Sequence, residues 1–313
     1  MSAPRLSIIL PTYNGADDLA RLLPALASQK VDGGFEICAI DSSSTDGTRD
    51  LLKRAGASIE VIPKSEFRHG ATRNRCALRA RGELLVFLSQ DVVPEGSRFL
   101  AELAGVFSDP RTAGAYGRVL PFESDDPLTA RTVLDLPEAE EHELVRDLDH
   151  VAGLHELSAE QRAEFVRFNN VASAIRADVF QKIPFPDLAF GEDFAWAARA
   201  LTAGWRLRFV PGAIARHAHH YSPAKAYERY RVDAAFHRLV HGHRLRPSLV
   251  SVARGFAFEV AADLRYLART ERAGKWSACL RSPILRGAQV LGQWVGSHGY
   301  AGGPRGEATG RMR

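Results

Sequence analysis

The sequence predicts an α/β protein with a mostly parallel, twisted sheet flanked by helices and followed by a helical C-terminal extension. Short apolar runs alternate with stretches of helical spacing over residues 5–90, which is the pattern of βαβ units. Polar residues directly follow three of these runs, at the position where open α/β sheets bind ligands. From about residue 223 only helical spacing remains, so the predicted sheet lies before that point.

The elements near the N-terminus follow from the spacing of their apolar side chains. Apolar runs that stop at a proline or a polar cluster predict buried strands at 6–10, 35–40, 59–62 and 84–88. Helical patterns are expected at 17–27, 48–55 and 71–80. Asp46 or Thr45 is the expected N-cap of the second helix, because short polar side chains accept the first free amide hydrogens of a helix.

The middle of the chain has a different character. Residues 123–164 carry few strand signals, and positions 135–149 hold seven acidic residues and one arginine. We expect helices or a mobile lid there. Order returns over residues 168–222, with a helix after the sequence FGED and a strand before the histidine-rich sequence RHAHHYS.

Helical patterns dominate the C-terminal third, and they define the expected domains. Helices are predicted at 224–240, 249–267 and 283–295. Residues 299–313 contain five glycines and no apolar pattern, which predicts a disordered tail. The expected division is a ligand-binding domain at 1–222, a helical region at 223–298 and the tail at 299–313.

Charge divides the chain into two parts. Residues 1–222 contain 25 Lys and Arg against 31 Asp and Glu, whereas residues 223–313 contain 16 against 6. The basic C-terminal part indicates an anionic partner such as a membrane surface or a charged lipid. A solvated basic face without a partner is an equally weighted alternative. No apolar run reaches the roughly 18 residues of a membrane span, so any membrane contact is expected to be peripheral.

Compartment is indicated by the N-terminus and by the three cysteines. The first apolar run is short and stops at Pro11, so we expect no secretion signal. Cys38, Cys76 and Cys279 are far apart in the sequence, which argues against a disulfide framework and against a cysteine-based zinc site. A reducing cytosol fits these observations.

Two aspartates end predicted strands, and each has a functional and a structural interpretation. Asp41 follows the strand at 35–40, where its carboxylate would accept a hydrogen bond from a pyrimidine imide or cap its own turn. Asp91 follows the strand at 84–88, where it would bind Mg²⁺ or Mn²⁺ bridging a diphosphate or close a turn. We favour the metal for Asp91, because other candidates converge on the same sheet edge.

Acids and histidines after residue 190 extend this set. Glu192 and Asp193 begin a helix, where acids complement the helix dipole and where a carboxylate would also be aimed as a general base. His217 and His219 share one face if their segment is extended, and one of them would complete a divalent metal site with Asp91. A structural role for the histidines is equally weighted.

A third candidate group is the sequence FRHGATRN at the start of a helix. Arg73 would hold a phosphate through its planar guanidinium group, helped by the helix N-terminus, with His69 nearby. The alternative is a surface arginine on a capped helix. Neither the P-loop pattern nor the Rossmann glycine pattern occurs in the sequence, so those two nucleotide-binding classes are excluded.

Several segments of the chain, in the order in which they occur, resemble those of glycosyltransferase family 2, which has the GT-A fold. The matching stretches are SIILPTYN, IDSSSTDGT, ATRNRCALRARGELLVFLSQD, GED and RHAHHY, and the resemblance covers residues 5–235. FRHGATRN followed by VFLSQDVVP is most similar to bacterial rhamnosyltransferases, which use dTDP-L-rhamnose. The resemblance implies inverting transfer of a sugar from a nucleoside-diphosphate donor to a glycan or lipid-linked saccharide acceptor, with Mg²⁺ or Mn²⁺ as cofactor.

The resemblance also implies a role for each matching residue. The donor-binding residues would be Pro11, Thr12, Tyr13, Asn14, Asp41, His69, Arg73, Gln90 and Asp91. Asp91 and His217 would hold the metal, and Asp193 would be the catalytic base. Glu192 and Trp196 would contact the acceptor. The chain departs from the family's usual D-x-D triplet, because Ser89 replaces its first carboxylate.

Competing functions remain open at this point. The chain would transfer another hexose from a UDP- or GDP-sugar, or it would bind nucleotide sugars without catalysis, as Ser89 suggests. A nucleic-acid partner is not expected, because the basic residues alternate with apolar helical faces and no nucleic-acid motif is present. We expect a cytoplasmic protein with peripheral contact at the inner face of the plasma membrane. The oligomeric state is left open.

Overall fold

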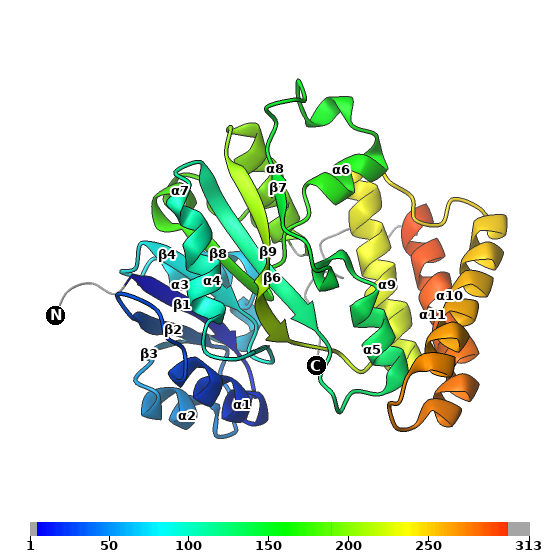
Figure 1. The fold of residues 1–313 in the computed structure, drawn as a ribbon, viewed down its shortest axis with the longest axis horizontal. Helices are drawn as coiled ribbons and strands as arrows, with labels where there is room; N and C mark the ends of the chain where they lie inside the picture. The colour runs from blue at the N-terminus through cyan, green and yellow to red at the C-terminus, as the bar shows by residue number, and fades with distance from the viewer. Residues whose placement is uncertain (1–4, 189, 300–313) are drawn as a thin grey trace. The chain divides into compact units, whose positions relative to one another are not determined.

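The computed structural model describes residues 5–188 and 190–299, which fall into two compact units (Figure 1). Unit 1 comprises Met1–Val119, Glu138–Glu156 and Val166–His217. Unit 2 comprises Leu120–Pro137, Leu157–Phe165 and Ala218–Arg313. Two segments from the middle of the chain therefore join the C-terminal helices in unit 2. The expected tail lies outside the described residues, apart from its first glycine.

Unit 1 is built on a nine-stranded sheet in the order β3-β2-β1-β4-β8-β6-β9-β5, with β7 also paired to β9. The strands are β1 (Leu6–Thr12), β2 (Phe35–Asp41), β3 (Ser58–Val61), β4 (Leu84–Leu88), β5 (Val93–Pro94), β6 (Thr112–Leu120), β7 (Leu144–Arg146), β8 (Ala172–Arg176) and β9 (Arg206–Arg216). The four strands predicted before residue 90 are confirmed, and they are parallel.

The second half of the sheet departs from the parallel pattern. β8 runs antiparallel to both β4 and β6, and β9 runs antiparallel to β5 and β7. The sheet is therefore mixed. The reversal matters for the site, because it brings the beginning of β8 to the edge where β4 ends.

The helices of unit 1 cover the sheet, and most begin where the sequence predicts. They are α1 (Ala16–Ala27), α2 (Thr48–Arg54), α3 (His69–Ala77), α4 (Phe99–Gly105), α7 (Ala177–Lys182) and α8 (Glu192–Thr202), with short 3-10 turns at Lys64–Glu66, Val106–Ser108, Pro137–Ala139 and Leu154–Glu156. Gly47, rather than Asp46 or Thr45, occupies the N-cap position of α2. Asp46 still accepts a hydrogen bond from the Thr48 amide, at 3.0 Å, and so provides a partner for the first amide of this helix.

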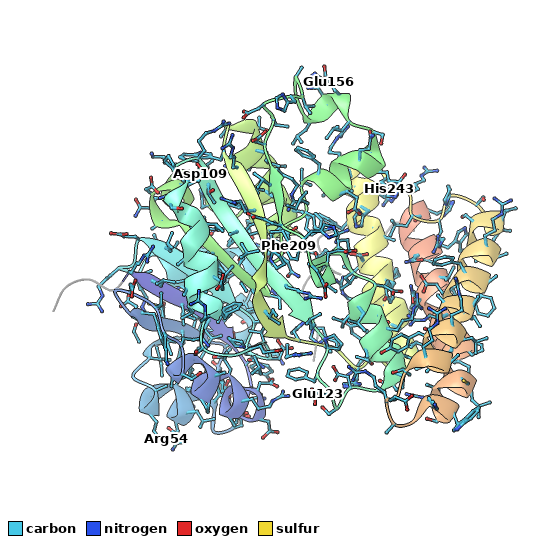
Figure 2. All side chains as sticks on the ribbon, in the orientation of Figure 1. Arg54, Asp109, Glu123, Glu156, Phe209 and His243 are labelled. Carbon is cyan, nitrogen blue, oxygen red and sulfur yellow. The ribbon has the colours of Figure 1, made fainter. Side chains whose placement is uncertain are left out.

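The core of unit 1 explains why its central strands are continuous apolar runs. Every residue of β4 is buried, as are Ile8, Ile9 and Leu10 of β1, because both faces of the sheet are covered. Leu19, Leu22 and Leu26 of α1 are fully buried in the same cluster. In the second half of the sheet, Phe209 of β9, labelled in Figure 2, packs on Tyr116 of β6 with ring centroids 5.2 Å apart.

The acidic segment is ordered by arginines of β9, and it contains a strand that the sequence pattern did not predict. Asp147 accepts a hydrogen bond from Nε of Arg206 at 2.9 Å, and Arg206 also contacts Asp149 at 3.2 Å. Arg208 pairs with Glu143 beside it. Charge pairing across the β7–β9 ladder therefore fixes a segment whose apolar spacing carries little information.

Unit 2 is helical throughout its described residues. Its helices are α5 (Pro127–Leu134), α6 (Ala159–Phe165), α9 (Pro223–Phe236) with a π-helical turn at His237–His241, α10 (Leu249–Arg269) and α11 (Lys275–His298). Pro283 lies inside α11 rather than at its start, so the helix is longer than predicted. A Cβ on Gly292 would lie 2.3 Å from the Tyr227 carbonyl oxygen, which shows how closely α11 and α9 pack.

A buried ionic network joins α5, α10 and α11 at the centre of unit 2. Asp263 is fully buried and accepts from Arg131 at 2.8 Å and from Arg286 at 2.8 Å. Burial opposes ionisation of Asp263, but the hydrogen bonds from Arg286, Ser282 and Arg131 hold its pKa below the ordinary range. Within the described residues, no helix has both the length and the apolar character needed to cross a bilayer.

Candidate functional site

The site begins where β1 and β2 end side by side. Their register pairs Thr12 with Asp41, and the Thr12 hydroxyl donates to the Asp41 carboxylate at 3.1 Å. The Ser44 amide and hydroxyl also donate to Asp41, at 2.9 and 2.5 Å. Asp41 is completely buried. It therefore closes its own turn, as the structural interpretation predicts, while it fixes the ends of two strands at this edge of the sheet.

The loop after β1 is held by Gln90 at the end of β4. Oε1 of Gln90 accepts from the Tyr13 amide at 2.8 Å, and Nε2 donates to the Tyr13 carbonyl at 3.3 Å. A Cβ on Gly15 would lie 2.6 Å from Cδ of Gln90, so glycine permits this close approach. Gln90 thus positions the loop by binding its backbone.

Pro11, the next-to-last residue of β1, is partly exposed.

Asn14 and Tyr13 complete this first group. Asn14 has a left-handed backbone with φ of 43°, and its side-chain oxygen accepts from the Thr45 amide at 2.9 Å. Nζ of Lys64 lies 4.0 Å from the centre of the Tyr13 ring and donates to its hydroxyl at 2.9 Å. The loops after β1 and β2 are therefore bonded to each other, and a cation stands beside the tyrosine.

Asp91 and His217 meet although they are far apart in the sequence. The antiparallel register pairs Val93 of β5 with Arg216 of β9, which brings the residue after β9 next to the residues before β5. Oδ1 of Asp91 lies 3.3 Å from Nε2 of His217. Their side chains are 25% and 12% exposed, so both can still reach a ligand. A carboxylate oxygen and an imidazole nitrogen are donors that suit Mn²⁺ and, less well, Mg²⁺.

A buried ion pair joins the beginnings of α3 and α8. Nη1 of Arg73 donates to Oε1 of Glu192 at 2.7 Å, and each side chain is 8% exposed. Gly70 permits the approach, since a Cβ there would lie 2.7 Å from the Pro186 carbonyl oxygen. His69 lies one helical turn from Arg73, with its Nδ1 3.5 Å from Nη1. Arg73 is therefore bound to a protein carboxylate rather than exposed as a surface arginine.

Asp193 follows this pair in the first turn of α8 and has an unusual environment. Its carboxylate accepts from the Asn170 amide at 3.3 Å and from the Phe194 amide at 3.0 Å. Loss of water around the carboxyl group, and then the negative charge of Glu192, raise the pKa of Asp193 to about 7. A carboxyl group that exchanges its proton near neutral pH is suited to general base catalysis.

Trp196 has surroundings different from those that the resemblance implies. Trp196 is fully buried, and its indole N–H donates to the Ile183 carbonyl at 2.8 Å. An acceptor cannot reach it, so the expected Trp196 contact is wrong; the side chain belongs to the core beneath α8. His219 and His220 belong to unit 2. There His220 bridges two aspartates, with 3.0 Å to Asp125 and 3.1 Å to Asp126.

These groups lie along one edge of the sheet of unit 1. β2, β1 and β4 are parallel and end there, while β8 is antiparallel and begins there. The Ser89 amide, just after β4, donates to the carbonyl of Val171 at 3.2 Å. Val171 follows Asn170, whose amide binds Asp193. The sheet edge therefore links the Asp41 turn, the Asp91–His217 pair and Asp193.

Four residues of this edge were not among the predicted site residues. They are Ser44, Lys64, Gly70 and Asn170. Ser44 follows Asp41 in a polar turn, and Asn170 stands in the sequence FNN before an apolar run, so local signals existed for both. Gly70 stands in the candidate sequence FRHGATRN. Lys64 carries no such signal, because its importance arises from its contact with Tyr13, which is distant in the sequence.

Comparisons with known proteins identify the family of the chain. The sequence model described as "Glycosyl transferase family 2" matches residues 7–153. O-antigen chain rhamnosyltransferase WbaN of Salmonella anatum is 31% identical over 239 residues, which cover 75% of this chain and 72% of the relative. O-antigen chain rhamnosyltransferase RfbN of Salmonella typhimurium is 29% identical over 239 residues, covering 74% and 72%.

Solved structures show the same architecture at lower sequence identity. The mannosyltransferase PcManGT from Pyrobaculum calidifontis, solved with GDP-Man and Mn²⁺, has a TM-score of 0.54 at 19% identity, covering 95% of this chain and 87% of its own. S. aureus TarS 1-349 has a TM-score of 0.53 at 18% identity, covering 92% and 90%. At these identities the likeness concerns the fold alone.

Proposed function

The chain belongs to glycosyl transferase family 2 and has a GT-A fold, and from this premise we propose that it is an inverting rhamnosyltransferase. The donor is dTDP-L-rhamnose, and the acceptor is a glycan or a lipid-linked saccharide. The observation that carries the catalytic part of this proposal is Asp193, whose pKa is raised to about 7 at the ligand edge of the sheet.

Nucleotide binding is assigned to the turns after β1 and β2. Asp41 holds both turns through Thr12 and Ser44. Because Asp41 is completely buried, we assign it to positioning the pocket for the pyrimidine rather than to direct contact with the base. Tyr13 and Lys64 stand at the same loop, where an aromatic ring and an ammonium group suit a base and a phosphate. Gln90 acts as a positioning residue, since it binds both the amide and the carbonyl of Tyr13.

Asp91 and His217 are the residues that would hold a divalent cation. Their donor atoms are 3.3 Å apart and both side chains remain partly exposed, which leaves room for diphosphate oxygens and water around an ion. When bound, the ion supplies positive charge that stabilises the leaving diphosphate. Because position 89 is serine, Asp91 is the one carboxylate of its triplet, and we expect the donor to contribute several of the ligands.

Proton transfer is assigned to Asp193. In the proposed reaction its carboxylate takes the proton of an acceptor hydroxyl, the hydroxyl oxygen forms a bond to the anomeric carbon, and the bond from that carbon to the diphosphate oxygen breaks. One displacement inverts the anomeric configuration. Arg73 acts as a positioning residue: it neutralises Glu192 and keeps the start of α8 in place, so that Asp193 faces the sheet edge.

The choice of rhamnose rests on the relatives. Two that cover about three quarters of this chain have names that specify O-antigen chain rhamnosyltransferases, at 31% and 29% identity. A different hexose carried by UDP or GDP is the alternative donor, and PcManGT was solved with GDP-Man. A nucleotide-sugar-binding protein without catalysis is the alternative from a different class, motivated by Ser89.

A donor panel tests the proposal. The full chain is melted with dTDP-L-rhamnose, UDP-glucose, UDP-galactose or GDP-mannose, each with and without Mn²⁺. A ligand at a hundred times its Kd stabilises a protein by about 2.7 kcal/mol, which corresponds to a few °C in a chain of this size. The largest shift is expected for dTDP-L-rhamnose with Mn²⁺, followed by release of dTDP when acceptor is added. A larger shift with a UDP- or GDP-sugar would overturn the donor, and binding without any transfer or hydrolysis would overturn catalysis.

A further inference from the structure

The outer face of α10 and α11 in unit 2 is unusually apolar. More than half of the exposed large apolar side chains among the described residues lie on these two helices. On α11, Trp276, Leu280 and Ile284 recur every four residues and are 79%, 80% and 65% exposed, so they form one stripe. Single exposed apolar residues are common, but a continuous stripe marks an interaction surface.

The exposed charges on this face are mostly positive. Of the two acids of α10, Asp263 is fully buried, and Glu259 is neutralised by Arg131 at 2.8 Å with its side chain 15% exposed. The sequence of α11 contains no Asp or Glu. On α10, Arg254 and Arg265 alternate with Val250 and Phe258, which are both 61% exposed. Over the part of the chain that the structure describes, neither of these two arginines forms an ion pair with a carboxylate. The face is therefore apolar and cationic.

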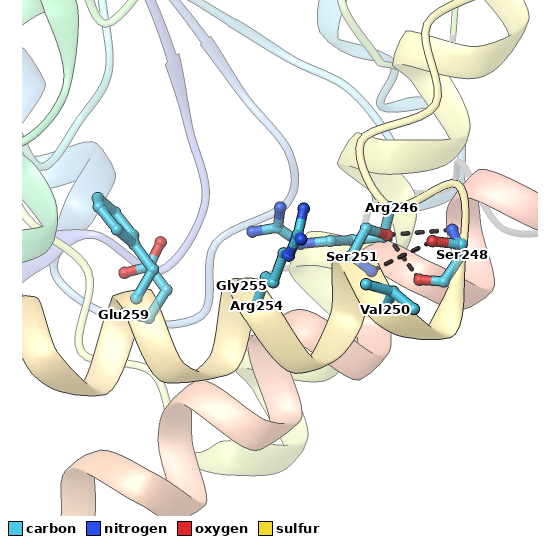
Figure 3. A pocket seen from close by; sticks show the side chains of 8 residues that line it. Arg246, Ser248, Val250, Ser251, Arg254, Gly255 and Glu259 are labelled. Atoms are coloured by element: carbon cyan, nitrogen blue, oxygen red, sulfur yellow. Dashed lines mark hydrogen bonds between the residues drawn. The ribbon is translucent and has the colours of Figure 1, made fainter.

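A pocket of about 490 Å³ lies along the first turns of α10, and its charged lining residues are Arg246, Arg254 and Glu259 (Figure 3). Arg246 crosses the helix at Gly255, where a Cβ would lie 2.6 Å from Cζ of the guanidinium group. Nε of Arg246 is buried and has no hydrogen-bond partner among the described residues. Burial lowers the pKa of Arg246, and the negative charge of Glu259 opposes this effect without reversing it.

The pocket owes its positive charge to these arginines and not to the helix start. Ser248 and Ser251 already cap the N-terminus of α10 through reciprocal hydrogen bonds of 3.0 and 3.2 Å (Figure 3). Arg254 lies in the second turn of the helix and also lines the pocket. Two guanidinium groups beside exposed Val250 suit a ligand that joins a phosphate to an apolar body.

We propose that the outer face of α10 and α11 docks on an anionic lipid bilayer, with the pocket at Arg246 and Arg254 receiving a lipid phosphate. The apolar stripe enters the headgroup region, and the arginines contact the anionic surface. A second copy of the chain fits this face poorly. Symmetric pairing of the face with itself would bring arginines together without a carboxylate to compensate them. The inference does not depend on which donor the site of unit 1 binds.

Sedimentation with vesicles tests the docking face. The full chain is mixed with phosphatidylcholine vesicles, with or without about 30% phosphatidylglycerol, at low and high salt. We expect binding to the anionic vesicles alone, weakened by salt. Each arginine near an anionic surface contributes about five-fold in affinity, so Arg254→Glu should weaken binding by about 25-fold. Lys30→Glu makes the same change in net charge at an exposed position of unit 1 and should leave binding nearly unchanged.

The apolar stripe has its own matched pair of variants. Leu280→Ser with Ile284→Ser should reduce vesicle binding, whereas Leu78→Ser, at a site of unit 1 that is 85% exposed, should not. Lipids brominated near the headgroup should quench the fluorescence of the bound parent, and Trp276→Phe should remove most of that quenching. The proposal is overturned by three results: no binding at low salt, equal losses for Arg254→Glu and Lys30→Glu, or a dimer that the Leu280 and Ile284 changes dissociate.

Discussion

Replacing Asp193 by asparagine separates a catalytic base from a simple helix cap. Asparagine keeps the shape of the side chain and is itself a good cap, but it cannot take a proton from an acceptor hydroxyl. Loss of a general base costs about 10²–10⁴-fold in rate. We therefore expect turnover of Asp193→Asn to fall by that factor, while the affinity for the donor, whose proposed binding residues do not include Asp193, stays close to that of the parent.

The same change has a predicted effect on stability, with a defined sign. The pKa of Asp193 is about 7 in the folded chain and about 3.9 in an unfolded one. Between these values the folded state holds more protons, so stability falls as the pH rises. From about pH 5 to about pH 8 the loss is at most about 3 kcal/mol, at about 1.36 kcal/mol per pKa unit. We expect about 1–3 kcal/mol, because water reaches part of the residue. Asp193→Asn removes this loss.

Two assays and one control complete the test. Turnover is measured from about pH 5 to about pH 9, and unfolding by urea is measured near both ends of that range. The parent should lose activity about ten-fold per unit below pH 7 as Asp193 becomes protonated, and the variant should not. Asp187→Asn is the control, since Asp187 is 56% exposed and pairs with Arg68 on the surface. Near-normal turnover of Asp193→Asn, with a stable fold, would remove Asp193 from the mechanism.

Three further outcomes are expected. Asp41→Asn exchanges one hydrogen-bond acceptor for a donor in a fully buried turn, and it should weaken dTDP binding by about ten-fold or more. Calorimetry would compare it with Asp50→Asn, whose side chain is 71% exposed. Equal dTDP affinities of the two variants would place the nucleobase site elsewhere. Excess EDTA should abolish activity, and His217→Ala should raise the Mn²⁺ concentration needed for half-maximal activity. Full activity in EDTA would exclude a metal role for Asp91 and His217. Gly292→Ala should destabilise unit 2 by about 1–3 kcal/mol, because its Cβ would lie 2.3 Å from the α9 backbone. Gly287→Ala, whose nearest contact is 3.9 Å away, should instead stabilise α11 by up to about 1 kcal/mol in thermal unfolding; similar losses for both would argue against close packing as the cause.

The sequence alone determined the elements whose signals are local. β1, β2 and β4 appear as continuous apolar runs because both faces of that part of the sheet are covered. The polar residues after those runs had to lie at one edge, since parallel strands end on the same side of a sheet. Thr12, Asp41 and Asp91 were therefore found from spacing and position, before any contact between them was known.

Sequence spacing gave weaker guidance for the second half of unit 1. The acidic stretch contains β7, which pairs with β9 through arginines that are more than 50 positions away. Periodicity has no access to such pairs, because they depend on charge rather than on alternation of apolar residues. The antiparallel direction of β8 was also unpredicted. The strands that pair with β8 are set by the course of the chain and not by the composition of β8 itself.

Tertiary structure decided which candidate side chains meet and what each can do. Asp91 reaches His217 only because β5 and β9 pair in one register, and Arg73 is neutralised by Glu192 across 119 positions. The family resemblance implied an acceptor contact for Trp196, but packing buries this side chain completely. The raised pKa of Asp193 comes from lost water and a neighbouring negative charge. Apolar spacing is a property of each segment, whereas desolvation and charge pairing exist only after distant segments have packed together.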